Sequence, residues 1–279
     1  MDKNYLIGID LGTSSVKTII TDSDGEILSL SSQEYDFSVP KPGWAEQEPR
    51  EWLEATLKTI KLACQNADIN PRRIAAIGLS GQMHGMVCLD GAGNPVRPAI
   101  LWPDQRSGVQ VEKIYQKIGV EKLGNWTLNP VATGFMAASW LWVQENESEI
   151  AHKTAHLLLP KDYLRWQFTG NFGTEPSDAS ATLLFDTANR RWSQPLLETM
   201  GIDPSLLPPI HESSQVAGFL TEEIAKAAGL PSGIPVIYGG SDQGMQALGN
   251  GLIESGTLSC AISTGGQLVM HLDSPIYDQ

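Results

Sequence analysis

Apolar runs and polar turns alternate closely along the first 35 residues of the chain. The runs at 5–9, 16–21 and 26–35 have the length and the flanking Gly, Asp and Ser residues that are typical of strands. Each is joined to the next by a short turn, so we predict an antiparallel meander. The following pattern is helical: Pro49 suits a first helical position, and apolar residues recur at helical spacing up to residue 66.

The rest of the chain continues to alternate between strand and helix patterns, which predicts an α/β fold. We expect strands at 74–80, 86–89, 155–159 and 235–238, a strand–turn–strand unit at 256–271, and helices at 109–118, 136–145, 161–168 and after Thr221. Residues 125–134 and 174–180 are expected to be loops, and the proline-rich stretch 206–210 a connector.

Composition narrows the classes of function. A net charge of −13 argues against a nucleic-acid or anionic-membrane partner, and no apolar run is long enough for a membrane span. The chain starts with no signal-peptide pattern, and its three cysteines form neither a metal motif nor a disulfide framework. We therefore expect a cytoplasmic protein.

One carboxylate stands alone after the strand predicted at 235–238. Gly239 and Gly240 allow backbone and ligand to approach closely, and Asp242 follows at the start of a helical pattern. A rigid strand would hold such an acid in place for catalysis. Asp is also a common helix cap, and the residues of this stretch alone leave both interpretations open.

A glycine- and hydroxyl-rich turn follows the first predicted strand. The backbone N–H groups around Gly12 and Thr13 could form an anion-binding concavity, and a divalent cation could bridge Asp10 to a phosphate. An ordinary tight hairpin explains the same residues. Residues 256–271 repeat the design with a second Ser-Thr-Gly-Gly turn, so the two hairpins could clamp a polyphosphate from opposite sides.

Two further stretches carry candidate binding residues. His84 lies between glycines in a loop bounded by two predicted strands, where it is either a ligand or a satisfied structural residue. Asp104 and Arg106 follow an apolar run that ends in Trp102; the alternative for this pair is a surface salt bridge of little energetic value.

Taken together, these motifs resemble the FGGY family of carbohydrate kinases, and within it most closely the xylulokinases. The resemblance covers nearly the whole chain in the family's order and is carried by Ile7-Gly-Ile-Asp-Leu-Gly-Thr-Ser14, Gly81-Gln-Met-His-Gly85, Ile100-Leu-Trp-Pro-Asp-Gln-Arg106, Leu159-Pro-Lys-Asp-Tyr-Leu164, Pro176-Ser-Asp-Ala-Ser180 and Gly239-Gly-Ser-Asp-Gln243. It implies a ribonuclease H-like (actin-like ATPase) fold with a mixed central sheet flanked by helices.

The resemblance also implies ATP-dependent phosphorylation of a ketopentose, D-xylulose to D-xylulose 5-phosphate, with ATP and Mg²⁺ as cofactors. Asp242 matches the catalytic base, and Asp10 the acid that holds the metal. The remaining implied contacts are Met83, His84, Gln243, Asp104 and Arg106 for the sugar, Gly12, Thr13 and Ser14 for a first phosphate turn, and Ser263, Thr264, Gly265 and Gly266 for a second.

The sequence departs from the family in two respects. Family members commonly carry Pro-Lys where this chain has Ala138-Ser139, and they are longer. We therefore expect residues 1–249 to be the sugar-binding domain and 250–279 to be the first hairpin of a C-terminal actin-like domain, with the isolated chain inactive as a kinase. The alternatives are a stand-alone sugar-binding module and a kinase for another sugar such as ribulose. The exposed edges of the hairpin make a homodimer conceivable.

Overall fold

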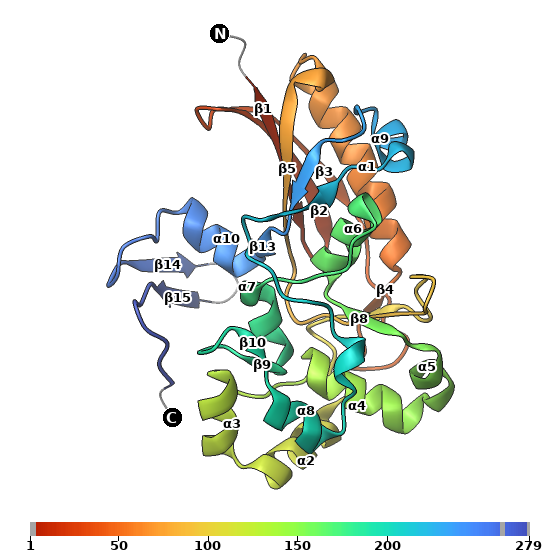
Figure 1. Ribbon diagram of the computed structural model, residues 1–279, viewed down its shortest axis with the longest axis vertical. Coiled ribbons are helices and arrows are strands. Elements are labelled where there is room, and N and C mark those ends of the chain that lie inside the picture. Colours follow the sequence, from red (N-terminus) through yellow and green to blue (C-terminus); the bar gives the residue numbers. More distant parts are fainter. Residues whose placement is uncertain (1–3, 263–265, 278–279) are drawn as a thin grey trace.

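A mixed sheet forms one half of the molecule (Figure 1). The computed structural model describes residues 4–262 and 266–277, and in this part of the chain seven strands join the sheet in the order β11-β12-β5-β1-β2-β3, with β13 also on β5. They are β1 (Tyr5–Leu11), β2 (Ser15–Asp22), β3 (Ile27–Glu34), β5 (Ile74–Gly81), β11 (Val216–Phe219), β12 (Pro235–Ile237) and β13 (Gly240–Ser241). The meander β1–β2–β3 is antiparallel, whereas β1, β12 and β13 run parallel to β5.

Alternating side chains decide which face of this sheet is covered. In β1, Ile7, Ile9 and Leu11 are buried, while Asp10 between them lies on the opposite face. Helix α1 (Pro49–Asn66) packs against β2 and β3, and α6 (Pro160–Thr169) and α9 (Glu222–Ala228) lie beside it (Figure 1). The predicted meander, the helix from Pro49 and the mixed sheet are confirmed.

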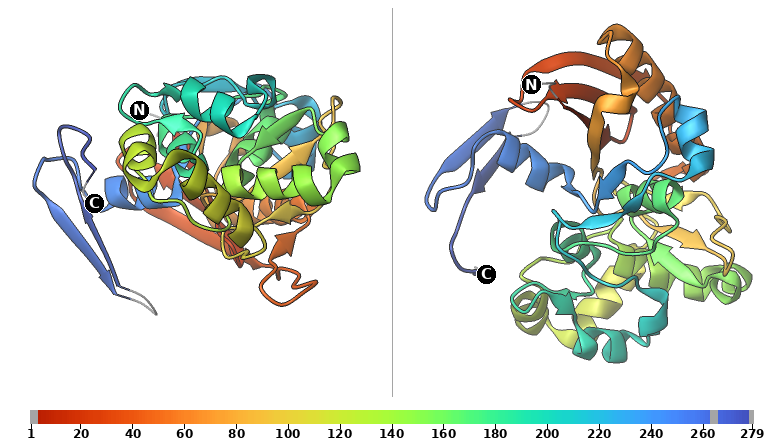
Figure 2. Two further views of the ribbon diagram at one scale, coloured as in Figure 1. Left: turned by 90° about the horizontal axis from the view of Figure 1, so that it is seen from below. Right: turned by 45° about the horizontal axis from the view of Figure 1, so that its top comes forward.

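The other half of the molecule is mainly helical and has its own apolar core (Figure 2). Its helices are α2 (Gly108–Ile118), α3 (Val120–Thr127), α4 (Met136–Asn146), α5 (Ser148–Lys153), α7 (Pro176–Ala179) and α8 (Gln194–Met200). It also contains the 3-10 turns η2 (Ser180–Thr182) and η3 (Pro204–Leu206). In the sheet half, the 3-10 turn η1 (Pro71–Arg73) precedes β5. Short strand pairs brace it: β4 (Glu46–Gln47) with β7 (Ala99–Ile100), β6 (Val87–Leu89) with β8 (His156–Leu158), and β9 (Phe185–Asp186) with β10 (Arg191–Trp192).

Two of the loop predictions are wrong in part. Helix α3 extends into the expected loop 125–134, because its apolar residues pack into the second core. The expected loop 174–180 contains α7, which begins with Pro176 and is capped by the carboxylate of Glu175. Tertiary packing stabilises both short helices, whose own sequences are weak helix signals.

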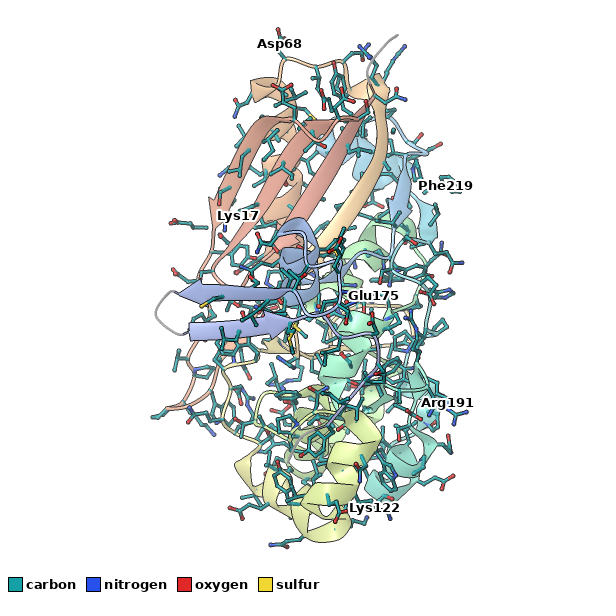
Figure 3. The ribbon with its side chains drawn as sticks, turned by 90° about the vertical axis from the view of Figure 1, so that its left-hand side faces the viewer. Lys17, Asp68, Lys122, Glu175, Arg191 and Phe219 are labelled. Atoms are coloured by element: carbon teal, nitrogen blue, oxygen red, sulfur yellow. The ribbon has the colours of Figure 1, made fainter. Side chains whose placement is uncertain are left out.

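The C-terminal segment consists of α10 (Asp242–Gly249) and an antiparallel pair, β14 (Leu258–Ile262) and β15 (Gly266–Met270). Among the described residues these two strands pair only with each other. Figure 3 shows them crossing in front of the junction between the sheet and the helical half in that view. Ser263, Thr264 and Gly265 of the expected second phosphate turn lie outside the described residues. No helix in the described ranges is long and apolar enough to cross a membrane.

Candidate active site

The carboxyl ends of three parallel strands meet at one point of the sheet. Asp10 of β1 is in register with Ser80 of β5, and Ser80 is in register with Gly240 of β13. The Ser80 hydroxyl donates a hydrogen bond of 2.8 Å to Asp10 Oδ1. Asp242 begins α10 two residues beyond Gly240. Because ligands of open α/β sheets bind beyond the carboxyl ends of the strands, this edge is the candidate active site.

Asp242 is not the cap of helix α10. The cap is Ser241, whose hydroxyl accepts a hydrogen bond of 3.2 Å from the Gly244 N–H. Within the described part of the chain, Asp242 Oδ1 accepts a local bond alone, from the Gln243 N–H at 2.7 Å. Burial raises the pKa of Asp242; the Gln243 N–H opposes this and the nearby Asp10 charge adds to it. A carboxylate with a raised pKa is a better proton acceptor near neutral pH.

One of the two glycines before Asp242 is required by the backbone. Gly239 has a φ of +78°, and a Cβ at this position would lie 1.9 Å from the Leu79 carbonyl oxygen of β5. A Cβ on Gly240 would lie 2.4 Å from the Met245 methyl group. Only glycine fits position 239 without displacing the β5 backbone, whereas at position 240 the contact is with the flexible end of a side chain; Gly239 thus lets the segment before Asp242 lie close against β5.

The turn at Gly12–Ser14 is held by side chains that contact its oxygen atoms. The Tyr35 hydroxyl donates to the Gly12 carbonyl at 2.7 Å, and Gln47 Nε2 donates to the Thr13 carbonyl at 2.8 Å. Trp102 Nε1 donates to Thr13 Oγ1 at 2.9 Å. Neither the Thr13 nor the Ser14 backbone N–H donates to any described residue. The turn therefore presents free N–H groups beside Asp10, as an anion site requires.

His84 is held in a strained conformation at the same edge. Its φ is +69°, which is uncommon for a residue with a Cβ. Its Nδ1 lies 2.9 Å from the Ala181 carbonyl, and its ring packs on Phe135 with centroids 3.9 Å apart. A carbonyl can only accept, so Nδ1 carries the proton. Burial lowers the pKa of His84, although the bond to Ala181 opposes this. The ring is then neutral, and Nε2 is left as an acceptor.

Asp104 and Arg106 form a buried pair, so the alternative of a surface salt bridge is wrong. Each side chain is only 1% exposed, and Arg106 NH2 lies 2.7 Å from Asp104 Oδ2. Asp104 also accepts the Ala45 N–H at 2.7 Å, and Arg106 NH1 lies 2.7 Å from Glu46 Oε1. The Arg106 guanidinium stacks on Trp44, 3.7 Å from the ring centroid. These contacts brace the loop after β7; the sugar contact expected for the pair stays a prediction.

The other two expected sugar contacts flank these groups. Met83 precedes His84 and is half-buried. Gln243 follows Asp242, and its Oε1 is buried without a hydrogen-bond partner in the described part of the chain. An unpaired buried acceptor is costly, which favours a ligand hydroxyl as its partner.

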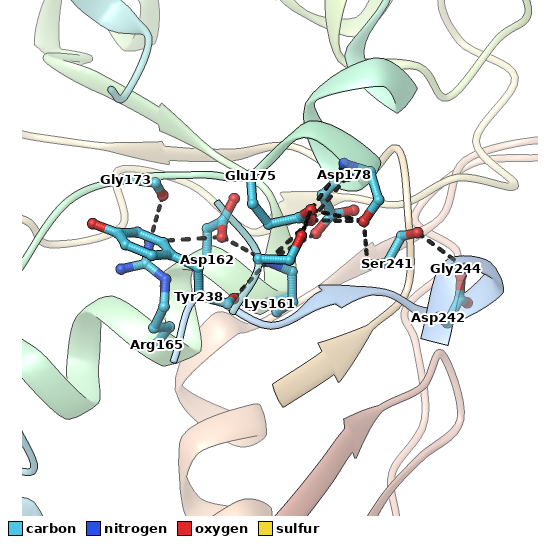
Figure 4. A network of polar contacts seen from close by, with 12 residues as sticks. Lys161, Asp162, Arg165, Gly173, Glu175, Asp178, Tyr238, Ser241, Asp242 and Gly244 are labelled. Atoms are coloured by element: carbon cyan, nitrogen blue, oxygen red, sulfur yellow. Dashed lines mark hydrogen bonds and ion pairs between the residues drawn. The ribbon is translucent and has the colours of Figure 1, made fainter. Parts of the chain in front are cut away.

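A cluster of buried charges lies beside the segment that leads to Asp242 (Figure 4). We call it the Lys161 cluster; its members are Lys161, Asp162, Arg165, Glu175 and Asp178, all with fully buried side chains. Lys161 Nζ lies 2.9 Å from Asp162 Oδ1, 3.4 Å from Asp178 Oδ2 and 3.7 Å from Glu175 Oε1. It also donates to the Tyr238 carbonyl at 3.2 Å, at the end of β12.

The charges of the Lys161 cluster balance if Asp178 is protonated. Two cations, Lys161 and Arg165, then face two carboxylates, Asp162 and Glu175. Burial raises the pKa of Asp178 well above its usual value; Lys161 opposes the shift, and the other carboxylates add to it. Burial also works against the charge of Lys161, but the neighbouring carboxylates, Asp162 first, raise its pKa. A charge-neutral cluster avoids an uncompensated buried ion.

Sequence reasoning matched the motifs of this cluster to a family but assigned its members no role. It also missed Ser80, Tyr35 and Trp102, because their importance comes from contacts with Asp10 and with the Gly12–Ser14 turn over long separations in sequence. Ala138 and Ser139, which depart from the family's Pro-Lys, are both buried in α4.

Comparison with known proteins identifies the family. Residues 5–249 match the model of the FGGY family of carbohydrate kinases, N-terminal domain. The chain is 38% identical over 274 residues to a xylulose kinase of Staphylococcus xylosus, covering 98% of this chain and 56% of that protein. It is 36% identical over 260 residues to a xylulose kinase of Escherichia coli K12, covering 93% and 53%. The chain belongs to the FGGY family of carbohydrate kinases.

Solved structures agree on the fold. A xylulose kinase from Rhodospirillum rubrum superposes with a TM-score of 0.91 at 27% identity, covering 95% of this chain and 54% of that one. A gluconate kinase from Lactobacillus acidophilus superposes with a TM-score of 0.90 at 25% identity, covering 96% and 54%. The chain thus spans about half the length of the relatives it matches. The expected ribonuclease H-like, actin-like fold is confirmed, and the backbone alone does not separate the two sugars.

Proposed function

We propose that the whole protein is an ATP-dependent kinase that converts D-xylulose to D-xylulose 5-phosphate. The observation that carries the proposal is that β1, which carries Asp10, and β13, which leads directly into Asp242, both pair with β5 at one sheet edge, where Ser80 is in register with Asp10 and Gly240. The xylulose kinases among the relatives favour this sugar over others. This chain would supply the sugar site, the base and the first phosphate turn.

Asp242 acts as the general base. Its carboxylate accepts the proton of the sugar's terminal hydroxyl as that oxygen forms a bond to the γ-phosphorus of ATP. The bond between the γ-phosphorus and the oxygen bridging to the β-phosphate breaks, and ADP leaves with that oxygen. The protein's contribution to such a transfer is mostly positioning and charge neutralisation. Burial of Asp242 helps because it raises the basicity of the carboxylate.

The residues around Asp10 fit a magnesium–phosphate group. Among the described residues no three His, Cys, Asp or Glu side chains cluster as a dedicated metal site. Mg²⁺ commonly uses one or two carboxylates together with substrate phosphates and waters, so a lone Asp10 is a suitable ligand. When bound, the ion would neutralise charge on the phosphates. The Thr13 and Ser14 N–H groups, beside Gly12, would hold a phosphate oxygen, and Thr264, Gly265 and Gly266 are the proposed contacts of a second phosphate.

The sugar would lie between His84 and Asp242. His84 Nε2 would accept a hydrogen bond from one hydroxyl, and Gln243 Oε1 from another, which would supply the partner that this buried oxygen lacks. Met83 would contact the carbon skeleton, and Asp104 with Arg106 would shape the loop beside it. A site built to pair with hydroxyls rejects sugars that lack them more strongly than an apolar pocket could.

The test is a coupled ADP-release assay on the whole protein with D-xylulose, D-ribulose, gluconate and glycerol, and with the product identified by NMR. We expect phosphorylation at C5 of xylulose with the highest kcat/KM. Asp242→Asn should lower kcat at least ~100-fold, the scale of a lost general base, with sugar affinity kept within about threefold. Asp203→Asn, an exposed carboxylate in a distant turn, is the matched control. Normal turnover in Asp242→Asn would refute the assignment of the base.

The proposal includes a cytoplasmic location. ATP-dependent sugar metabolism takes place there, and Cys64 and Cys88 are free and buried, as expected in a reducing compartment. Fractionation of cells that make the whole protein would test this point.

A further inference from the structure

One serine connects the Lys161 cluster to the strand that carries Asp242. Ser177, in the first turn of α7, has its Oγ 2.8 Å from Glu175 Oε2 and 2.9 Å from Glu175 Oε1. A carboxylate can only accept, so the Ser177 hydroxyl donates to Glu175. The same Oγ accepts the backbone N–H of Ser241 at 2.9 Å. Figure 4 shows dashed contacts that lead from the cluster to Ser241, the residue before Asp242.

The two hydrogen bonds that lead from Ser241 to Glu175 point in the same direction. Ser241 N–H donates to Ser177, Ser177 donates to Glu175, and Glu175 faces the Lys161 ammonium at 3.7 Å. Bonds aligned in this way polarise and strengthen one another where the dielectric constant is low. The residue at the near end, Ser241, is the cap of α10 and directly precedes Asp242.

The cluster holds the segment before Asp242 at two points. Lys161 Nζ donates to the Tyr238 carbonyl, and Ser177 accepts from Ser241. Between them, Gly239 and Gly240 have no side chains, so the conformation of this stretch depends on backbone contacts such as the bond of 3.0 Å from the Gly239 N–H to the Ser213 carbonyl. On the opposite side the segment is paired with β5 through Ser80 and Gly81. The direction in which Asp242 leaves β13 thus depends on contacts from α6 and α7 as well as on the sheet.

We propose that Ser177 is a positioning residue, whose hydroxyl ties β13 and the adjoining Asp242 to the Lys161 cluster. It does not touch the reacting atoms; it acts through Ser241. The proposal rests on the proposed function to the extent that Asp242 is the base. Misplacement of a catalytic group by a fraction of an ångström lowers the rate without abolishing binding, so Ser177 should affect kcat more than KM.

Ser213 offers a matched control. Its hydroxyl also donates to Glu175, at 2.8 Å from Oε2, and like Ser177 it is half-buried. Its side chain makes no bond to the Ser241 backbone in the described chain. Ser177→Ala and Ser213→Ala thus each remove one hydroxyl from the same carboxylate, but only the first releases β13. Ser177→Thr keeps the hydroxyl, and Ser177 borders an open cleft of about 750 Å³.

The experiment compares these variants in the whole protein by steady-state kinetics with xylulose and ATP. We expect Ser177→Ala to lower kcat about 10- to 100-fold with the sugar KM within about threefold. Ser213→Ala should keep kcat within about twofold, and Ser177→Thr should restore most of the rate. Equal losses in the two alanine variants would overturn the proposal, since a purely structural role predicts them.

A second measurement does not depend on kinase activity. Amide hydrogen exchange at Ser241 should become at least about tenfold faster in Ser177→Ala and stay unchanged in Ser213→Ala and Ser177→Thr. If the whole protein phosphorylates none of the sugars but shows this pattern, the proposed function fails and the positioning contact stands. Unchanged exchange in Ser177→Ala would overturn the positioning role whatever the enzyme's activity.

Discussion

Replacing Lys161 by methionine should strongly destabilise the protein. The ammonium group is fully buried and faces Asp162 at 2.9 Å, Asp178 at 3.4 Å and Glu175 at 3.7 Å. Methionine fills a similar volume but removes the charge. Asp162 and Glu175 would then be left with Arg165 as the single cation of the cluster, and Arg165 NH2 lies 3.6 Å from Asp162.

The expected loss follows from the cost of an unpaired buried charge, about 3–5 kcal/mol when one partner of a buried pair is removed. For a domain of this size, 1 kcal/mol shifts the melting temperature by about 2–4 °C, so we expect a fall of about 6–20 °C. The control is Lys113→Met, which breaks the exposed pair of Lys113 and Glu145. Such a surface pair contributes below about 1 kcal/mol.

Thermal unfolding of the whole protein, followed by circular dichroism at pH 7, measures both shifts. The double variant Lys161→Met/Asp162→Asn provides a second check, because it removes the acid nearest to the lost ammonium. We expect it to be more stable than Lys161→Met alone. If Lys161→Met melts as close to the wild type as Lys113→Met does, or if the second change gives no recovery, the cluster is not held by balanced charges.

Three further predictions concern single positions. His84→Ala should weaken sugar binding, measured by calorimetric titration, by about 1–3 kcal/mol, because a sugar hydroxyl would lose its partner. Its melting temperature should fall less than that of Lys161→Met. If the sugar affinity is unchanged, His84 has a structural role. Burial raises the pKa of Asp178, so the folded state keeps a proton that the unfolded chain releases above the ordinary pKa. As pH rises from 4, Asp178→Asn should therefore gain stability over the wild type, by up to about 1.4 kcal/mol per unit until the folded pKa is passed. Hydrogen bonds from Ser205 lower the pKa of Asp203, so the stability that its carboxylate adds is already complete above the ordinary pKa, and Asp203→Asn should show no trend relative to the wild type above about pH 4 in the same urea titrations. Gly239→Ala should lower both stability and kcat, because its Cβ would collide with the Leu79 carbonyl; equal effects from Gly91→Ala, where nothing lies within 4 Å, would contradict this.

The local sequence predicted the elements of the sheet well. Ile7, Ile9 and Leu11 alternate with less buried neighbours, and the apolar run of β5 is bounded by polar turns, so strand positions follow from side-chain periodicity alone. Pro49 marks the first turn of α1 for an equally local reason, since its fixed φ suits a helix start. The short helices α3 and α7 escaped prediction because packing and a cap from Glu175 stabilise them.

Some residues of the candidate site could likewise be predicted from the local sequence, whereas the roles of others became clear only from contacts in the fold. Asp10, His84 and Asp242 could be singled out from the sequence because each lies beside glycines at the end of an apolar run, a local signal of a turn at a strand end. The sequence could not identify the N-cap of α10, because Ser and Asp both cap helices. Only the backbone geometry showed that Ser241 is the cap and that Asp242 is not.

By itself, the sequence determined which residues lie at the strand ends, since a period of two or of 3.6 residues is set by neighbours in the chain. Only the tertiary structure decided what these residues contact. Asp10 meets Ser80 across 70 positions, Ser177 meets Ser241 across 64, and Lys161 meets Tyr238 across 77. Contacts of such separation depend on strand order and register. The burial they create sets the charge of Asp178 and the basicity of Asp242, because the free energy of a charge depends on the medium around it.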